Sequence, residues 1–245
     1  MANIVDQFHA RFSPKAVKPD AYYDKNDVIL FHHIPKAAGT SVGAGIKKVV
    51  DSFRTIQWDD VHNGFVRASN DAIYARTEKN MRQVIMGHYN AQNVQFWRNN
   101  RLPIKAASII RDPYERFVSQ YNYNCSPKHP AHQTFMERFP TMMSFAKSTQ
   151  TDFQLRYLLG PTFDLDDALK RLCTDFTFIG CVEHLDASLE HFSKSHGLEP
   201  IPTFSLNTGV VKTSEVEVDE EIRALILSKN RNDLKFHKLV LELYA

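Results

Sequence analysis

The feature that most constrains the fold is a short apolar run that ends abruptly and passes into a helical pattern. Residues 28–34 (VILFHHI) are rich in β-branched and aromatic side chains, and the run is long enough for a buried strand. It stops at Pro35, and apolar residues then recur at helical spacing over 42–49. Thr40 and Ser41 are residue types that cap helices. The pattern predicts a strand, a tight loop and a helix in succession.

Three further strand-length apolar runs follow, at 83–86, 104–110 and 176–181. Segments with helical spacing separate them or follow them. We expect helices near 68–79, 113–124, 141–148, 151–159, 165–173, 185–195, 217–228 and 231–243. Strands that alternate with helices predict an α/β fold with a mainly parallel sheet covered on both faces.

Composition narrows the class of protein. The 245 residues are 43% hydrophobic and 24% charged, as in ordinary globular proteins, which excludes a disordered or collagen-like chain. The net charge of +2 is too small for a general nucleic-acid binder. The three cysteines lack a Cys-x-x-Cys spacing, so neither a disulfide framework nor a structural zinc site is expected.

The organisation predicted for the chain is simple. Residues 1–26 are interpreted as a polar N-terminal arm, and residues 27–245 as a single domain. Apolar runs are strand-length, so we expect neither a signal peptide nor a membrane span, and a cytoplasmic location.

The loop after the first strand contains the residues of an anion site. Gly39 allows close approach of a ligand to the backbone, and the N–H groups at the helix start point toward it. Lys36 adds a positive charge, and Thr40 and Ser41 add hydroxyl donors. The lysine precedes the glycine, so this is not a Walker A sequence. The alternative is an ordinary strand–helix turn with a capped helix.

A second candidate site follows the strand at 104–110. Arg111 leaves the carboxyl end of that strand, where open α/β sheets bind ligands. Asp112 is placed to cap the next helix in a capping box with Glu115. Ser119, seven residues after Asp112, returns to nearly the same helix face. An arginine and a serine can therefore meet one anionic group.

Together the two segments resemble the sulfotransferases that use 3′-phosphoadenosine 5′-phosphosulfate (PAPS), particularly the carbohydrate (heparan sulfate or hexuronic acid) 2-O-sulfotransferases. In that branch H-I-P-K-[TA]-[AG]-G-[TS]-[ST] binds the 5′-phosphosulfate, and R-D-P-x-x-R-x-x-S-x-[YF] binds the 3′-phosphate. Residues 178–189 resemble a further conserved block and residues 230–244 the C-terminal helix, so the likeness covers most of 28–244. It implies a P-loop-like, nucleotide-binding, three-layer α/β/α fold.

The resemblance also implies roles for particular residues. Donor-binding residues would be Lys36, Ala38, Gly39, Thr40 and Ser41 on the 5′ side, Arg111 and Ser119 at the 3′-phosphate, and Lys212 in a closing loop. Lys36 would also be catalytic, by neutralising charge on the leaving phosphate. No metal is expected, because lysine, arginine and backbone amides supply the positive field.

His88 is the expected general base. Members of the branch carry a catalytic histidine in a Gly-His setting after the second strand, and Gly87-His88 fits that place. His33 is expected only to pack or to orient the loop, and His32 to point to the other side of the sheet. The rival bases are acidic residues of the 51–80 segment, namely Asp59, Asp60 and Glu78.

The function predicted is sulfuryl transfer from PAPS to an acceptor hydroxyl, on a carbohydrate or a small glycoconjugate. Segments 51–80 and 125–160 are expected to form the acceptor site. Their basic side chains include Lys128, His129, His132, Arg138, Lys147 and Arg156. Two alternatives stay open: a P-loop-type nucleotide kinase, which the missing Gly-Lys-Ser/Thr disfavours, and a non-catalytic nucleotide- or glycan-binding module.

Overall fold

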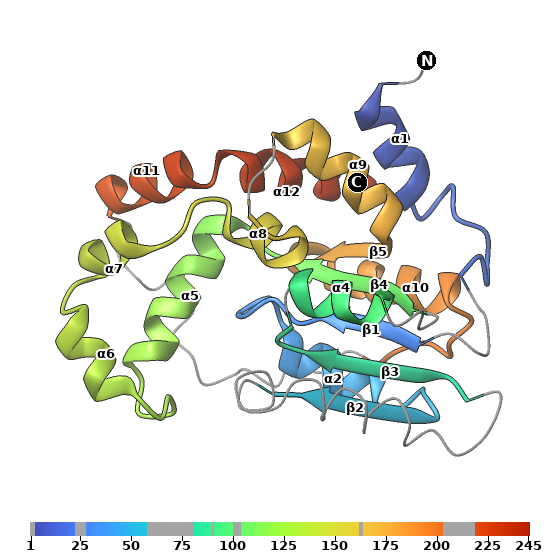
Figure 1. The fold of residues 1–245 in the computed structure, drawn as a ribbon, viewed down its shortest axis with the longest axis horizontal. Helices are drawn as coiled ribbons and strands as arrows, with labels where there is room; N and C mark the ends of the chain where they lie inside the picture. Colours follow the sequence, from blue (N-terminus) through green and yellow to red (C-terminus); the bar gives the residue numbers. More distant parts are fainter. Residues whose placement is uncertain are drawn as a thin grey trace.

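A parallel β-sheet forms the centre of the computed structural model, which describes residues 3–22, 28–57, 81–89, 91–99, 104–161, 164–202 and 219–245. Within these ranges the sheet has five strands in the order β2-β3-β1-β4-β5, and every neighbouring pair is parallel (Figure 1). The strands are β1 (Val28–His32), β2 (Ser52–Ile56), β3 (Gln83–Gly87), β4 (Ile104–Ile110) and β5 (Phe176–Cys181). The predicted α/β fold with a parallel sheet is confirmed.

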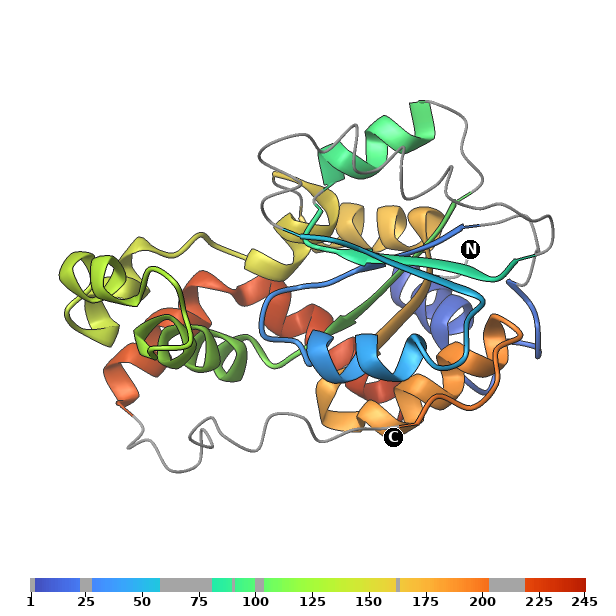
Figure 2. The ribbon, with the colours of Figure 1, turned by 90° about the horizontal axis from the view of Figure 1, so that it is seen from below.

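Helices cover both faces of the sheet, with α2 and α10 on one face and α4, α8 and α9 on the other (Figure 2). The helices are α1 (Ile4–Phe12), α2 (Gly39–Ile46), α4 (Ala91–Asn99), α5 (Pro113–Cys125), α6 (His132–Arg138), α7 (Met142–Ser148), α8 (Phe153–Leu159), α9 (Leu165–Asp175), α10 (Leu185–Ser195), α11 (Glu220–Lys229) and α12 (Arg231–Leu243), with a 3-10 turn at Val182–His184. No helix in the described ranges is long and apolar enough to cross a bilayer.

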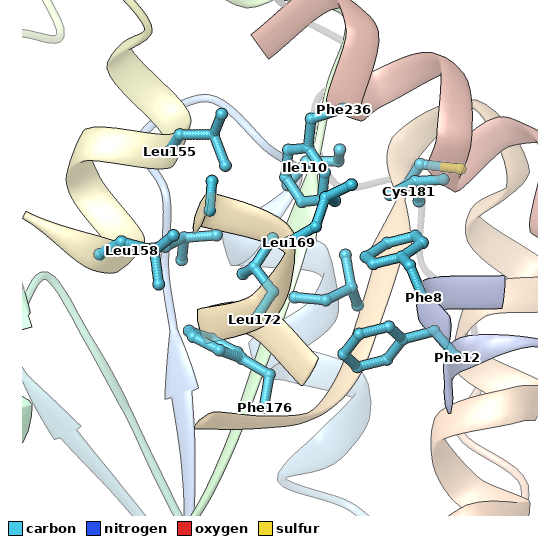
Figure 3. Close-up of a cluster of buried hydrophobic side chains, with 14 of the residues drawn as sticks. Phe8, Phe12, Ile110, Leu155, Leu158, Leu169, Leu172, Phe176, Cys181 and Phe236 are labelled. Carbon is cyan, nitrogen blue, oxygen red and sulfur yellow. The ribbon is translucent and has the colours of Figure 1, made fainter. Parts of the chain in front are cut away.

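The N-terminal segment departs from the polar arm that the sequence predicts. Helix α1 packs against α9 and α12, and the side chains of Phe8 and Phe12 are fully buried in the main apolar cluster with Phe236 (Figure 3). The two phenylalanines are four residues apart and so lie on one helix face. Burying each contributes about 1.5–3 kcal/mol of apolar stabilisation, so this helix is part of the core.

Three elements fall where the sequence predicts none. Strand β2 occupies the start of the 51–80 segment, helix α4 lies in 91–99, and helix α6 lies in 132–138, where no helix is expected. Along β2 only Ser52 and Ile56 are buried, as suits an edge strand, and no described side chain of α6 is buried. Sparse burial leaves little apolar periodicity for a sequence pattern to show.

Helices α5, α6, α7 and α11 form an extension beyond the sheet (Figure 1). Helix α5 starts at the end of β4 and its apolar side packs with α7 and α11 around Phe117, Ala146 and Ile226. The same helix therefore joins the sheet edge to the extension.

Candidate functional site

The chain topology produces a switch point at the carboxyl ends of the central strands, and we call the sheet edge at this point the crevice. Strand β1 lies between β3 and β4, with His32 paired opposite Gly87 on one side and Ser108 on the other. Strands β3 and β4, which are consecutive in the chain, thus lie on opposite sides of β1. Open parallel sheets bind ligands at such a switch point in the strand order. The residues that follow these three strands, His33, His88 and Arg111, emerge at this edge.

The loop after β1 has the backbone of an anion cradle. Lys36 and Ala38 adopt left-handed conformations, with φ of 70° and 56°. Such non-glycine residues are uncommon and cluster at functional sites. Ala38 is the N-cap of α2 and has no side-chain oxygen to bond the first N–H groups of the helix. Those N–H groups are therefore available to an anion at the positive end of the helix dipole.

The capping role predicted for Thr40 and Ser41 is wrong. Helix α2 begins at Gly39, so both residues lie in its first turn, with Thr40 exposed and Ser41 buried. The left-handed Ala38 turns the chain into the helix two residues before the first predicted side-chain cap, Thr40. The hydroxyl of Thr40 lies at the surface beside the cradle.

His33 connects the cradle to His88. Its ring lies against the Cα of Gly39, where an added Cβ would overlap it. The same ring stacks on His88, with centroids 4.2 Å apart and planes inclined by 29°. Burial, followed by the neighbouring His88 and Lys36, lowers the pKa of His33 to about 3. His33 is therefore neutral and contacts both the cradle, at Gly39, and the ring of His88.

A backbone contact fixes the tautomer of His88. Its Nδ1 lies 3.0 Å from the carbonyl oxygen of His33, so in the neutral ring Nδ1 carries the hydrogen and donates it. The basic lone pair is then on Nε2. Burial lowers the pKa of His88, and the bond to His33 opposes that shift. The imidazole is therefore neutral at neutral pH, as a general base requires.

Lys36 lies between the cradle and α5. Its Nζ sits 4.1 Å from the ring centroid of Tyr123, an aromatic residue that the sequence reasoning does not single out. Burial and then the nearby Arg111 lower the pKa of Lys36. The Lys36 carbonyl also accepts a long bond of 3.4 Å from Nη1 of Arg111. Lys36 thus contacts Arg111, just before α5, through its carbonyl and Tyr123, near the end of α5, through its ammonium group.

Arg111 stands at the start of α5 as predicted, but its surroundings differ. Asp112 caps the helix by accepting from the N–H groups of Tyr114 and Glu115. The predicted capping box is incomplete, because the Asp112 N–H donates to Glu183 at 2.7 Å, and Glu115 lies 3.5 Å from Arg111 instead. Glu115 therefore competes for the cation that is predicted to bind phosphate.

Ser119 lies one turn beyond Glu115 and one turn before Tyr123 on α5, where it is half-buried. The flanking residues both face the Lys36–Arg111 side, Glu115 through Arg111 and Tyr123 through Lys36. The predicted partnership of Ser119 with Arg111 is therefore compatible with the register of the helix.

A carboxylate–histidine pair supports the beginning of α5. Oε2 of Glu183 lies 3.0 Å from Nε2 of His237, and Oδ2 of Asp112 lies 4.0 Å from Nδ1 of the same ring. Burial alone would raise the pKa of Glu183, but the bonds from His237 and the Asp112 N–H outweigh it and lower the pKa. The motif R-D-P is thus tied to β5 and α12 through Glu183.

The other predicted residues either lie outside the described residues or make local contacts near α5 and α6. Lys212 and the rival bases Asp59, Asp60 and Glu78 lie outside the described residues. His129 and His132 make local contacts, with Nδ1 of His132 3.1 Å from the His129 carbonyl. Over the described ranges, no group of three or more His, Cys, Asp or Glu side chains could hold a metal ion.

Comparisons with known proteins are consistent with these motifs. No curated protein sequence matches the chain. The crystal structure of mouse sulfotransferase SULT7A1 complexed with PAP is similar over 88% of this chain and 69% of that one, with 16% identity and a TM-score of 0.43. The model of the sulfotransferase family matches residues 19–239, nearly the full length. This chain therefore belongs to the sulfotransferase family.

Proposed function

We propose that the protein transfers the sulfuryl group of PAPS to a hydroxyl group of a carbohydrate or small glycoconjugate. The observation that carries the proposal is that Lys36, His88 and Arg111 all follow central strands at one edge of the sheet. His33 stacks on His88 and is influenced by the charge of Lys36, and Arg111 bonds the Lys36 carbonyl. A cation and a neutral base at the same sheet edge suit transfer to a hydroxyl.

The residues at the crevice fit the two anionic ends of the donor. The left-handed loop and the uncapped start of α2 suit the 5′-phosphosulfate, with Lys36, Ala38, Gly39, Thr40 and Ser41 around it. Arg111 and Ser119 would bind the 3′-phosphate, and Lys212 would close over it. When bound, PAPS supplies an activated sulfuryl group with a phosphate as the leaving group.

Lys36 would act on the leaving side. The bond between sulfur and the 5′-phosphate oxygen breaks while the bond from sulfur to the acceptor oxygen forms, and negative charge grows on the phosphate. An ammonium group fixed in a partly buried loop stabilises that charge strongly, because little water screens it. Lys36 must leave the face of Tyr123 or extend past it to do so.

His88 would act on the acceptor side. Nδ1 donates to the His33 carbonyl, so Nε2 accepts the proton of the attacking hydroxyl. The lowered pKa keeps the ring neutral before transfer. The stacked His33 holds the plane of the ring and stays neutral itself, so it does not repel the proton that His88 accepts.

A saccharide acceptor is supported by the side of the crevice formed by the end of α5. The ring of Tyr123 faces Lys36 and packs edge-on against His129, with centroids 5.4 Å apart. Aromatic faces suit the apolar faces of sugar rings, and the basic residues of the neighbouring extension suit acidic substituents. Lys128 is exposed there, beside His129.

The direct test is transfer from labelled PAPS. The wild-type protein is incubated with EDTA, labelled PAPS and a panel of saccharides, and both labelled product and 3′,5′-phosphoadenosine (PAP) are measured. We expect equal amounts of the two products without metal. Turnover of ATP that requires Mg²⁺, with no transfer of sulfate, would instead identify a nucleotide kinase. Binding of PAP without turnover on any acceptor would favour a binding module.

A further inference from the structure

The peptide groups of Arg111 are held by a buried side chain from a distant part of the chain. The Arg111 N–H donates to Oε1 of Gln154 at 3.0 Å, and Nε2 of Gln154 donates to the Arg111 carbonyl at 2.7 Å. Gln154 is fully buried. The last pair of the β4–β5 ladder is Ile110 with Cys181, so the amide of Gln154 bonds both peptide groups of the first residue after that pair.

Gln154 is itself fixed by an exchange of caps between two helices. The backbone N–H groups of Gln154 and Leu155 donate to the two carboxylate oxygens of Asp233, at 2.8 and 2.9 Å. In return, Oδ1 of Asp152 accepts from the N–H groups of Asn232 and Asp233, at 2.9 and 3.1 Å. Each of α8 and α12 thus satisfies the first N–H groups of the other, which gives Gln154 a rigid base.

The side chain of Arg111 has weaker contacts than its backbone. Nη1 lies 3.4 Å from the Lys36 carbonyl and Nη2 lies 3.5 Å from Glu115, both at the limit of hydrogen bonding. A long side chain with such contacts takes its direction from the Cα–Cβ bond. That direction is set by the φ and ψ angles of Arg111, and Gln154 restrains the peptide groups on both sides of them.

We propose that Gln154 is a positioning residue for Arg111, and that discrimination in favour of donors with a 3′-phosphate depends on its two hydrogen bonds. The inference rests on the proposed function, because it takes Arg111 as the 3′-phosphate ligand. Gln154 is fully buried and acts through the backbone of Arg111, so it is a positioning residue and not a catalytic one.

The test compares the affinities of PAP and AMP, which differ in the 3′-phosphate. Calorimetry in EDTA gives the ratio of the two affinities for the wild type, Gln154→Met, Arg111→Ala and the double variant. Methionine has nearly the volume of glutamine and makes neither bond. We expect Gln154→Met to lower the ratio by about 10-fold or more, the scale of a charged hydrogen bond. AMP affinity should change by less than about 3-fold, and the double variant should match Arg111→Ala.

Asn230→Leu is the matched control. Asn230 is buried, its Oδ1 accepts from the Phe153 N–H at the start of α8, and its Nδ2 donates to the Ile226 carbonyl. It shares the helix pair but does not touch Arg111, so the variant should lose stability and keep the wild-type ratio. An equal loss of the ratio in Asn230→Leu would show a general structural effect and overturn the proposal.

Gln154→Glu serves if the methionine variant does not fold. The carboxylate can still accept from the Arg111 N–H but cannot donate to its carbonyl, so the ratio should also fall. A folded Gln154→Met or Gln154→Glu protein with the wild-type ratio would overturn the inference. Equal affinities of the wild type for PAP and AMP would instead contradict the 3′-phosphate site, so the two failures are distinguishable.

Discussion

The two halves of the crevice handle charge differently. At the carboxyl ends of β1 and β3, Lys36 and His88 have lowered pKa values, and Lys36 pairs with no carboxylate among the described residues. At the ends of β4 and β5, Arg111 lies near Glu115, and Asp112, Glu183 and His237 form a connected group. Both halves belong to the same sheet edge.

The difference indicates that the two halves have different roles. Burial without a counter-ion disfavours the charged state of Lys36 and His88 and leaves them reactive toward a ligand. Paired charges and clamped backbone bonds, by contrast, give fixed geometry. We therefore expect changes on the β1–β3 side to affect turnover and changes on the β4–β5 side to affect donor affinity.

The largest expected effect is on His88. In His88→Asn, the side-chain amide can still donate a hydrogen bond to the His33 carbonyl, as Nδ1 does. The basic Nε2 is absent. We expect turnover to fall by roughly 10²–10⁴-fold, with PAP affinity unchanged. Steady-state rates with calorimetry of PAP measure both. His9→Asn, on helix α1 that packs against α9 and α12, is the control. Wild-type turnover in a folded His88→Asn protein would assign the base elsewhere, to Asp59, Asp60 or Glu78.

Lys36→Ala should reduce turnover by about 10²–10³-fold, the scale for losing one group that stabilises transition-state charge. The affinity for PAP should fall much less, because the charge on the leaving oxygen grows only during transfer. Single-turnover kinetics at saturating PAPS separate the two effects. A variant whose only defect is a raised KM for PAPS would show that Lys36 acts in donor binding. That result would contradict the assignment of turnover to the β1–β3 side.

Arg111→Ala should affect donor affinity, because Arg111 lies on the β4–β5 side of the crevice. We expect PAP affinity to weaken by about 1.5–3 kcal/mol, the range for hydrogen bonds to charged groups. The rate of the bound complex should change little. Lys235→Ala removes a cation on the exposed side of α12 and provides the control. Loss of turnover without loss of affinity would show that Arg111 takes part in the chemical step.

For Glu115→Gln we expect a smaller change, an increase in the affinity for PAP. Glu115 lies 3.5 Å from Arg111, with 39% of its side chain exposed. Removing its negative charge frees Arg111 and relieves repulsion of the 3′-phosphate. Exposed pairs contribute about 0.2–1 kcal/mol, so PAP should bind a few-fold more tightly in calorimetry. Weaker binding would mean that Glu115 orients Arg111 and does not compete with phosphate.

Titration of His88 gives the finest test of the β1–β3 side. Burial lowers its pKa below the ordinary 6.5, so the neutral base should persist to pH values below 6.5 in the ligand-free protein. NMR of the imidazole protons, assigned with His88→Asn, measures the midpoint directly. A His88 midpoint above 6.5 would mean that a nearby anion, and not burial, dominates its environment.

Sequence reasoning reached most of the central sheet. The runs that became β1, β3, β4 and β5 are continuous apolar segments, because strands of a parallel sheet are covered on both faces. The cradle and the start of α5 are also local in sequence, so their residues could be named without a structure. The edge strand β2 has only two buried residues, which is too little to recognise.

The contacts that join the site were not predictable in the same way. His33 and His88 are 55 residues apart, and Gln154 is 43 residues from Arg111. Gln154 belongs to no motif, and the motifs that contain His33 and His88 do not show that the two rings stack. Tyr123 follows Ser119 by one helix turn, so the helix period could have pointed to it once Ser119 was chosen.

The measurement that tests the account most directly is a calorimetric titration of the wild-type protein with PAP and with AMP, both in EDTA. The account places one anion site at the start of α2 and another at Arg111, both at the same edge of the sheet, and proposes that one nucleotide binds to both. It predicts that PAP binds at least about 10-fold more tightly than AMP without metal, the scale of one charged hydrogen bond. Equal affinities, or binding that requires Mg²⁺, would contradict it.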